Sequence, residues 1–324
     1  MKPLISIYGT VFNNANIIRK SIESVISKLP DFREKFEMVI VDNYSTDGTY
    51  EILKGYQKRY PNITIIQEKC TRGKGRAIAF DNTKGKYVLM IDFDTVYLEP
   101  FKNIVYNYKR IKPNEIYPMF MMRRQTMKTI GNWKNLNYAE DLELSANAIS
   151  EGVKVYSIPC AFFENETKKN REKRYANGYS YIKRQLKNYA DMISGGGLNL
   201  LDLINRRKNH NKIKIILLYF FCKIINPKKF RHSKKYNNID LFNNHLLFIS
   251  PKGLGIKNKY WVGEVNYGIS SKDIIKTVYT LCHIGLNQTK LITHNSKSLL
   301  SLYHKNADKN IIKRRIAHFK ANTS

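Results

Sequence analysis

Two aspartates separated by one residue, Asp92 and Asp94, directly follow a run of four apolar residues at 88–91. An uninterrupted apolar run of this kind is typical of a strand that is buried on both faces of a sheet. Open α/β sheets bind their ligands at the carboxyl ends of such strands. Carboxylates at that position can hold Mg²⁺ or Mn²⁺ together with phosphate oxygens. A turn that happens to contain aspartate is the simpler alternative.

The segments before this run predict alternating strands and helices. The expected strands lie at 4–8, 38–41 and 62–67. Such alternation predicts an α/β fold, with a mostly parallel sheet and helices on both faces. Asp42 ends the second strand, and the carboxyl ends of parallel strands meet at one edge of a sheet. We therefore expect Asp42 to share that edge with Asp92 and Asp94.

A basic stretch interrupted by glycines, 71–77, precedes a short helix pattern. Gly73 and Gly75 would let the backbone approach a ligand closely, and the N-terminus of a helix favours an anion. Lys74 and Arg76 add positive charge to that preference. We expect a loop that holds a phosphate, and an ordinary turn before a helix is the alternative.

Acidic residues recur further along the chain. The patterns there predict a strand at 116–122, a polar loop at 123–137 and a helix that begins within 138–144. Glu140 and Asp141 lie in the first turn of this helix, where the helix dipole alone favours acidic side chains. All seven histidines lie at or after His210, so a general base in this part of the chain would have to be a carboxylate. Asp141 is well placed for that role.

The order and spacing of these motifs resemble the catalytic domain of family 2 inverting glycosyltransferases, which has the Rossmann-like GT-A fold. The motifs are VIVDNYSTDGT, RGKGRA, YVLMIDFDT and NYAEDLEL, and the resemblance covers roughly residues 3–165. The basic stretch is particularly similar to that of the dolichyl-phosphate sugar synthases within this group. The resemblance implies a transferase of the hexosyl type that uses a nucleotide-diphosphate sugar donor.

The resemblance also implies roles for the acidic residues in the first half of the chain. It implies that Asp42 holds the nucleotide base of the donor. It implies that Asp94 is the direct ligand of Mg²⁺ or Mn²⁺, with Asp92 near the ribose or the metal. The basic stretch that contains Gly73 and Arg76 would then lie against the donor diphosphate.

In this family a single in-line displacement inverts the configuration at the anomeric carbon. The resemblance implies that Asp141, in the Glu140-Asp141 pair, deprotonates the acceptor hydroxyl. A general base of this kind contributes about 10²- to 10⁴-fold to the rate. The sequence leaves open whether the accepting group is a hydroxyl or a phosphate, and whether it belongs to a lipid-linked group, a glycan or a protein.

The second half of the chain is strongly basic. Of the net charge of +30, residues 166–324 contribute +24, with 32 Lys and Arg against 8 Asp and Glu. Such a charge favours a polyanionic partner, either an anionic membrane surface or nucleic acid. Lysines that only solvate the surface are the alternative. A second hypothesis is therefore a nucleic-acid-associated binding protein with a degenerate transferase domain, although no nucleic-acid fold signature accompanies the charge.

Two segments in this half have helical patterns of functional interest. The basic segment 168–193 contains Arg171 and Arg174, which either cover the donor diphosphate or lie on a solvated face. The apolar stretch 213–225 has 13 residues. That is short of the about 20 residues that a spanning helix needs. The stretch predicts an interfacial helix on a membrane surface, and core packing is an equally good alternative.

These patterns predict three regions and a location. The regions are a GT-A catalytic domain at 1–165, a basic amphipathic helical segment at 166–226 and a basic region of unknown role at 227–324. We expect the extension to be mainly helical, with a strand at 246–249 and a helix at 272–283. The four cysteines lie far apart, which indicates reduced thiols. The N-terminus has no signal-peptide pattern, so we expect a cytoplasmic protein that can also lie on the cytoplasmic membrane face.

Overall fold

A computed structural model describes residues 3–165, 178–206, 212–225, 238–266, 289–293 and 299–314 of the chain. Its central sheet has five strands in the order β3-β2-β1-β4-β7. Strands β1 to β4 run parallel, and β7 pairs antiparallel with β4. They span β1 (Ile5–Val11), β2 (Phe36–Asp42), β3 (Ile63–Gln67), β4 (Tyr87–Met90) and β7 (Met122–Arg123). The expected α/β fold with a mostly parallel sheet is confirmed.

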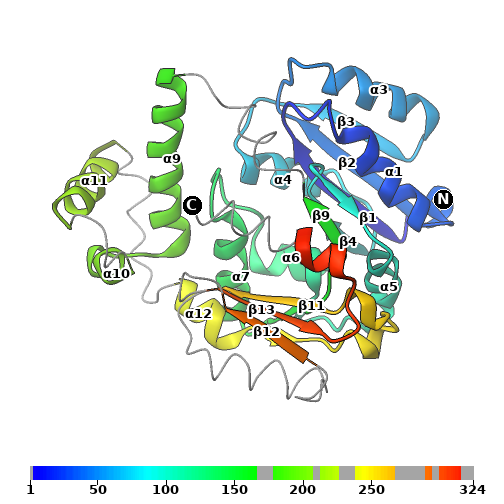
Figure 1. The fold of residues 1–324 in the computed structure, drawn as a ribbon. Coiled ribbons are helices and arrows are strands. Elements are labelled where there is room, and N and C mark those ends of the chain that lie inside the picture. Colours follow the sequence, from blue (N-terminus) through cyan, green and yellow to red (C-terminus); the bar gives the residue numbers. More distant parts are fainter. Residues whose placement is uncertain are drawn as a thin grey trace.

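Helices cover both faces of this sheet (Figure 1). One face packs against α1 (Ile18–Lys28), α2 (Phe32–Lys35), α3 (Thr49–Arg59) and α5 (Pro100–Tyr106). The other packs against α4 (Arg72–Asp81), α6 (Arg124–Ile130) and α7 (Glu140–Ser150). A 3₁₀ turn, η1 (Asn107–Arg110), follows α5. The strands are therefore buried on both sides, as their uninterrupted apolar sequences predict.

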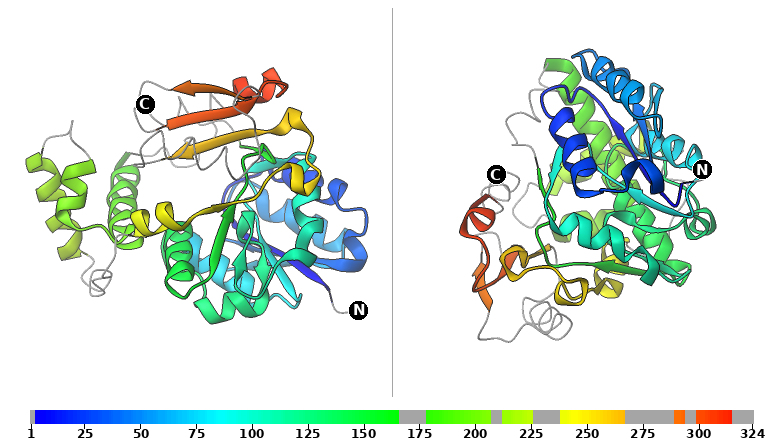
Figure 2. Two further views of the ribbon diagram at one scale, coloured as in Figure 1. Left: turned by 90° about the horizontal axis from the view of Figure 1, so that it is seen from below. Right: turned by 90° about the vertical axis from the view of Figure 1, so that its right-hand side faces the viewer.

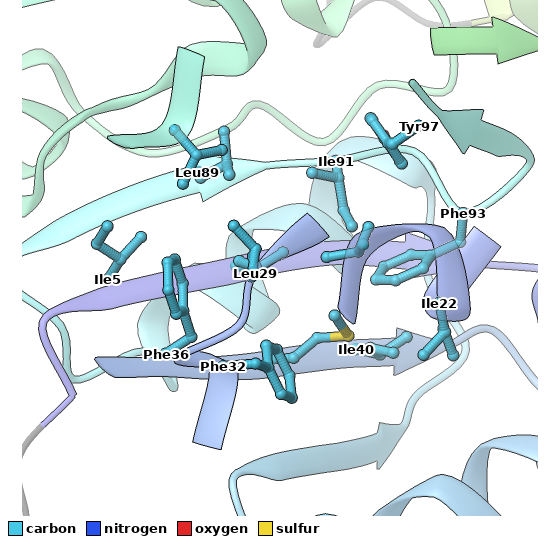
Figure 3. Close-up of a cluster of buried hydrophobic side chains, with 14 of the residues drawn as sticks. Ile5, Ile22, Leu29, Phe32, Phe36, Ile40, Leu89, Ile91, Phe93 and Tyr97 are labelled. Carbon is cyan, nitrogen blue, oxygen red and sulfur yellow. The ribbon is translucent and has the colours of Figure 1, made fainter. Parts of the chain in front are cut away.

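The two hydrophobic cores follow from the alternation of side chains along each strand. In β1, Ile7 belongs to the core on the α1 side, and the next residue, Tyr8, belongs to the core on the α4 side. Figure 3 shows the first core, to which Leu89 and Ile40 from the sheet and Ile22 from α1 all contribute. In the sequence, the core residues Val41 and Ile91 are followed directly by Asp42 and Asp92.

The stretch 71–77 was predicted to be a loop, and that prediction is wrong because α4 already begins at Arg72. Thr71 is the N-cap residue of this helix, and its Oγ1 accepts a hydrogen bond from the Lys74 N–H at 3.1 Å. Both glycines lie inside the helix. A Cβ on Gly75 would be 2.5 Å from Thr10 Oγ1. The close packing of α4 on β1 therefore leaves room only for glycine at this position.

The predicted strand at 116–122 and the predicted loop at 123–137 also need correction. The strand is divided into β6 (Glu115–Ile116) and β7 by a 3₁₀ turn, η2 (Pro118–Phe120). Met119 and Phe120 have φ angles of 63° and 49°, which no strand can contain. The loop contains α6, which buries Met127 and Ile130 at a helical spacing against the sheet.

Part of the C-terminal half packs directly on the first half. Strand β8 (Lys154–Ser157) lies between β6 and β10 (Leu247–Phe248), and β5 (Thr95–Tyr97) pairs with β9 (Phe163–Asn165). After β10 come two 3₁₀ turns, η4 (Lys252–Leu254) and η5 (Asn258–Tyr260). The Asn103 side chain donates to Leu254 O at 3.1 Å, and the Ala161 N–H donates to Tyr260 O at 2.8 Å. These hydrogen bonds fix the segment after β10 to the first half of the chain.

The remaining described residues form helices and a further three-stranded sheet. The helices are α9 (Gly178–Gly196), α10 (Leu200–Arg206), α11 (Lys212–Ile225) and α12 (Asn238–His245). The sheet is antiparallel in the order β11-β13-β12, with β11 (Val262–Asn266), β12 (Thr289–Thr293) and β13 (Leu299–His304). Within the described ranges of the extension, helices α9 to α12 contain most of the residues in regular elements, as expected, and the antiparallel sheet is an addition that the sequence did not predict. The expected strand at 246–249 corresponds to β10, and the expected helix at 272–283 lies outside the described residues.

Within the part of the chain that the structure describes, no helix is long and apolar enough to cross a bilayer. This agrees with the short length of the apolar stretch now seen as α11.

Close packing between β1 and the end of β4 makes Gly9 sensitive to substitution. A Cβ at Gly9 would overlap the carbonyl oxygen of Ile91 and touch the ring of Phe93. We expect Gly9→Ala to lower the free energy of unfolding by about 1–3 kcal/mol in urea denaturation. The matched control is Gly55→Ala in α3, where a Cβ meets nothing within 4 Å. That variant should gain up to about 1 kcal/mol, and equal effects at both positions would contradict this account.

Candidate active site

The aspartates follow strands that end at the same edge of the sheet. In the parallel ladders, Val11 of β1 pairs with Asp42 of β2, and Tyr8 pairs with Met90 of β4. Asp92 comes two residues after the end of β4. The topology therefore brings the acidic side chains after β2 and β4 to the edge where such folds bind their ligands.

Arg76 connects the two acidic motifs. Its Nη2 is 2.8 Å from Asp92 Oδ1, and its Nη1 is 2.9 Å from Glu140 Oε1. The Arg76 side chain is only 5% exposed. Burial by itself would lower the pKa of Arg76, but the charges of Asp92 and Glu140 outweigh burial and raise it. The guanidinium therefore stays charged and holds the motif after β4 beside the first turn of α7.

Trp133 supports Arg76 through its ring. The guanidinium carbon lies 4.9 Å from the ring centroid, which is a cation–π contact. The indole Nε1 of Trp133 donates to the Tyr8 hydroxyl at 3.0 Å. Tyr8 is fully buried, and burial raises the pKa of its hydroxyl far above the usual range, so it stays neutral. Sequence analysis missed Trp133, and a large aromatic residue inside a segment expected to be a polar loop was the available signal.

Glu140 and Asp141 are neighbours with different surroundings. Glu140 is buried, and its Oε1 accepts from Arg76 and, at 3.3 Å, from Arg72. Its Oε2 is also buried and has no hydrogen-bond partner among the described residues. Asp141 is exposed, and its Oδ1 accepts from the Leu142 N–H at 2.8 Å. Asp141 is therefore the carboxylate of the pair that a substrate can reach.

The first N–H groups of α4 are already bonded to the protein. The Arg72 N–H donates to Asn137 Oδ1 at 3.2 Å, and the Gly73 N–H donates to Leu136 O at 2.8 Å. The N–H of Lys74 is taken by the N-cap side chain. The expected phosphate site at this helix N-terminus would therefore use the exposed side chains of Arg72 and Lys74 in place of these three N–H groups.

Asp42 is fully buried and has one unsatisfied oxygen. Its Oδ2 accepts from the Ser45 N–H and from Gln67 Nε2, each at 3.1 Å. Its Oδ1 has no hydrogen-bond partner within the described ranges. A buried unsatisfied acceptor costs about 1–3 kcal/mol. A ligand N–H that reached this oxygen would remove that cost.

Cys70 lies near this part of the site but is unsuited to nucleophilic chemistry. Burial raises the pKa of its thiol to about 11, with Glu68 and Asp42 adding to the shift and Lys74 opposing it. The thiol is therefore protonated at physiological pH, whereas a reactive cysteine needs a lowered pKa. Its backbone N–H donates to Asn43 Oδ1 at 2.8 Å, which fixes the turn after β2.

Asp92 and Asp94 suit a hard divalent cation that a substrate helps to bind. The Asp92 side chain is 55% exposed, and Asp94 is half-buried. Among the described residues, no group of three or more His, Cys, Asp or Glu side chains is arranged to hold a metal ion. Mg²⁺ and Mn²⁺ are commonly held by one or two carboxylates, with phosphate oxygens and water completing the shell. The donor set fits such an ion.

Two further observations concern residues beyond α7. Arg171 and Arg174, expected to cover the diphosphate or to be solvated, lie outside the described residues. Asp191 of α9 was not singled out by sequence analysis, yet it is fully buried, and its Oδ2 accepts from the Asn137 N–H at 2.7 Å. The same Asn137 contacts α4 through its side chain. An acidic residue in a basic helix was the only signal for Asp191.

Comparison with known proteins places this site within a described family. The family model for Glycosyl transferase family 2 matches residues 6–198. The matched span contains all of the elements that form the site, from β1 to α9.

Curated relatives are similar over shorter stretches. A poly(ribitol-phosphate) beta-glucosyltransferase of Bacillus spizizenii is 32% identical over 93 residues, which are 28% of this chain and 14% of that protein. A dolichyl-phosphate beta-glucosyltransferase of Trichomonas vaginalis is 32% identical over 97 residues, 28% of this chain and 30% of that protein. The chain thus matches less than a third of the length of either relative.

A solved structure shows a weaker likeness. The mannosyltransferase PcManGT from Pyrobaculum calidifontis, in complex with GDP-Man and Mn²⁺, is 16% identical with a TM-score of 0.44. The alignment covers 71% of this chain and 72% of that one.

The buried ion pairs of Arg76 make the site sensitive to the loss of its guanidinium. We expect Arg76→Met to lower the free energy of unfolding by about 3–5 kcal/mol, because Glu140 is left charged and buried. Arg72→Met should cost less than about 1 kcal/mol, because the Arg72 side chain is 46% exposed. Urea denaturation measures both changes.

The double variant Arg76→Met/Glu140→Met tests the cause of this loss. Replacing both charged partners with apolar side chains should recover most of the stability. If the double variant were as unstable as the sum of its single variants, the ion pair would not be the source of the effect.

Proposed function

Because this chain belongs to glycosyl transferase family 2, we propose that it transfers a sugar from a nucleotide-diphosphate donor to an acceptor, with inversion at the anomeric carbon. The observation that carries the proposal is the bridge from Asp92 through Arg76 to Glu140. This bridge holds carboxylates suited to a metal beside the first turn of α7, where Asp141 is exposed. A transferase that joins donor and acceptor needs both groups in one site.

The donor would lie along the carboxyl edge of the sheet. Asp42 Oδ1, which has no hydrogen-bond partner among the described residues, is suited to accept an N–H from the nucleotide base. The exposed cations Arg72 and Lys74 would neutralise the diphosphate. Arg76 was expected to contact the donor, but two carboxylates already engage it, so we assign it to positioning Asp92.

Asp94, with Asp92, would bind Mg²⁺ or Mn²⁺. Such an ion supplies positive charge that stabilises a diphosphate leaving group. Asp92 keeps one oxygen on Arg76, so its other oxygen is the one available for the ion or the ribose. The geometry thus supports unequal roles for the two aspartates.

Asp141 would act as the general base. The acceptor oxygen attacks the anomeric carbon, the bond from that carbon to the diphosphate breaks, and Asp141 takes the proton of the acceptor hydroxyl. Glu140 is buried, and its Oε1 already accepts hydrogen bonds from two arginines, so it is poorly placed to take this proton. The exposed carboxylate of Asp141 favours a hydroxyl acceptor, because the oxygen of a phosphate acceptor is already ionised.

For the acceptor, we propose only a chemical class. The relatives' names include poly(ribitol phosphate) and dolichyl phosphate. These names support a polyol-phosphate polymer or a lipid-linked group as the acceptor, and a glycan or a protein is the alternative.

Donor binding can be tested by thermal unfolding with UDP-, GDP- and dTDP-sugars, with and without Mn²⁺ or Mg²⁺. A ligand at 100 times its Kd adds about 2.7 kcal/mol, which should raise Tm by several degrees. We expect a metal-dependent rise with one nucleotide, and its loss in Asp94→Asn. The control is Asp81→Asn at the other end of α4, which should keep the rise. A rise that Asp94→Asn leaves unchanged would remove Asp94 from the metal site.

The role of Asp141 can be separated from donor binding. Asp141→Asn should lower kcat by about 10²- to 10⁴-fold, because it removes the general base. The variant should keep the donor-dependent rise in Tm, since the side chain is exposed at the acceptor side of the site. A folded Asp141→Asn protein that no longer bound the donor would exclude Asp141 as the base.

A further inference from the structure

Helices α10 and α11 expose an unusual amount of apolar surface. Of the eight large apolar side chains that are exposed in the described part of the chain, six belong to these two helices. They are Leu201 (69% exposed), Ile213 (67%), Leu217 (66%), Phe220 (51%), Phe221 (46%) and Ile224 (77%), and we call them the hairpin face. On α11 they recur every three or four residues, so they form one stripe along the helix.

This stripe is not the side of α11 that packs on the protein. The opposite side of α11 contributes Ile215, Tyr219 and Cys222 to a small buried cluster. Ile193 of α9 and Leu203 of α10 complete that cluster. A helix that is apolar on both sides is expected to be buried on both sides. The hairpin face is therefore a second contact surface, beyond the one that holds the helices together.

Figures 1 and 2 show where this surface lies. Helices α10 and α11 lie at the edge of the molecule, and α9 lies between them and the central sheet. Neither helix contributes to the two cores of the sheet.

Positive charges border the stripe. Residues 200–225 contain six Lys and Arg against one acidic residue, Asp202. Lys212 and Lys223, near the two ends of α11, are exposed, and so is Lys187 on α9. An apolar stripe bordered by lysines is the pattern of a helix that lies in the interface of an anionic bilayer, with its apolar side among the acyl chains.

We propose that the hairpin face docks the protein on an anionic lipid bilayer, with α11 parallel to the membrane surface. Ile213, Leu217 and Ile224 are aliphatic and offer no ring for stacking on a nucleic-acid base, whereas acyl chains cover them well. A second copy of the chain would bring the same lysines together, which opposes dimerisation through this face. The proposal goes beyond the transferase activity and does not depend on it.

Helix α9 connects the docking surface to the candidate active site. Asp191 in α9 accepts the Asn137 N–H, and Gly195 approaches Ala139 so closely that a Cβ would lie 2.8 Å from its carbonyl oxygen. Ala139 immediately precedes Glu140. Docking would thus hold the first turn of α7 at a fixed position relative to the bilayer, which suits an acceptor carried by the membrane.

The test is sedimentation of the full chain with vesicles of phosphatidylcholine alone or mixed with phosphatidylglycerol, at low and high salt. We expect the wild type to sediment with the mixed vesicles at low salt and to be partly released by salt. Leu217→Ser/Phe221→Ser should reduce vesicle partitioning at least about tenfold, because two apolar side chains no longer enter the bilayer. Lys212→Gln/Lys223→Gln should reduce it about 30-fold.

A matched control separates the effect of the hairpin face from the effect of the overall positive charge. Lys20 and Lys58 are exposed on α1 and α3, far from α10 and α11 in the sequence. The variant Lys20→Gln/Lys58→Gln should therefore bind vesicles as the wild type does. All replaced side chains are exposed, so the variants should unfold at the wild-type temperature. The donor-dependent rise in Tm should also be unchanged, which distinguishes a failure of docking from a failure of the proposed activity.

Four results would overturn the proposal. The first is a wild type that does not sediment with mixed vesicles at low salt, and the second is equal binding to vesicles of phosphatidylcholine alone. The third is a folded Leu217→Ser/Phe221→Ser variant that binds like the wild type. The fourth is a wild-type dimer in analytical ultracentrifugation that dissociates in this variant, which would assign the hairpin face to a contact between two copies.

Discussion

The arrangement of the site depends on one buried positive charge. The Arg76 guanidinium has lost its water, so it must be paired, and its partners come from two distant motifs in the sequence. Because a buried ion pair adds little to stability by itself, its main effect is positional. It requires the segment after β4 and the first turn of α7 to lie close together. Trp133 adds a third constraint, since its contact with Tyr8 ties the guanidinium to the central strand.

The elements with strong sequence patterns were predictable. The apolar run before Asp92 forms β4, and the alternation of strands and helices gives the parallel sheet. The failures lie where tertiary contacts override local preference. Two glycines in the first turn of α4 suggested a loop, but neighbouring backbone and side chains fill the space that a Cβ would need. The positive φ angles of Met119 and Phe120 have no sequence signal, because neither residue favours them.

The residue types of the candidate site were predictable, but the contacts between its side chains were less so. The sequence indicated acidic groups at strand ends and at the start of α7. It did not indicate that Glu140 is buried against arginines while Asp141 is exposed. Adjacent helical residues point in directions about 100° apart. Which of them faces inward depends on the position of Arg76, a residue more than sixty positions earlier in the chain.

Asn137 makes hydrogen bonds in two directions. Its N–H is held by Asp191 in α9, and its side chain holds the first turn of α4 through the Arg72 N–H. Asn137, which lies just before α7, thus connects α9 with α4. Helix α9 lies next to α10 and α11, and α4 lies next to the expected diphosphate. If α9 rotated while Asp191 kept its hydrogen bond to the Asn137 N–H, Asn137 would move with the helix. The Arg72 N–H at the start of α4 would then lose its hydrogen bond to the Asn137 side chain. The segment before α7 therefore couples the position of α9 to the start of α4.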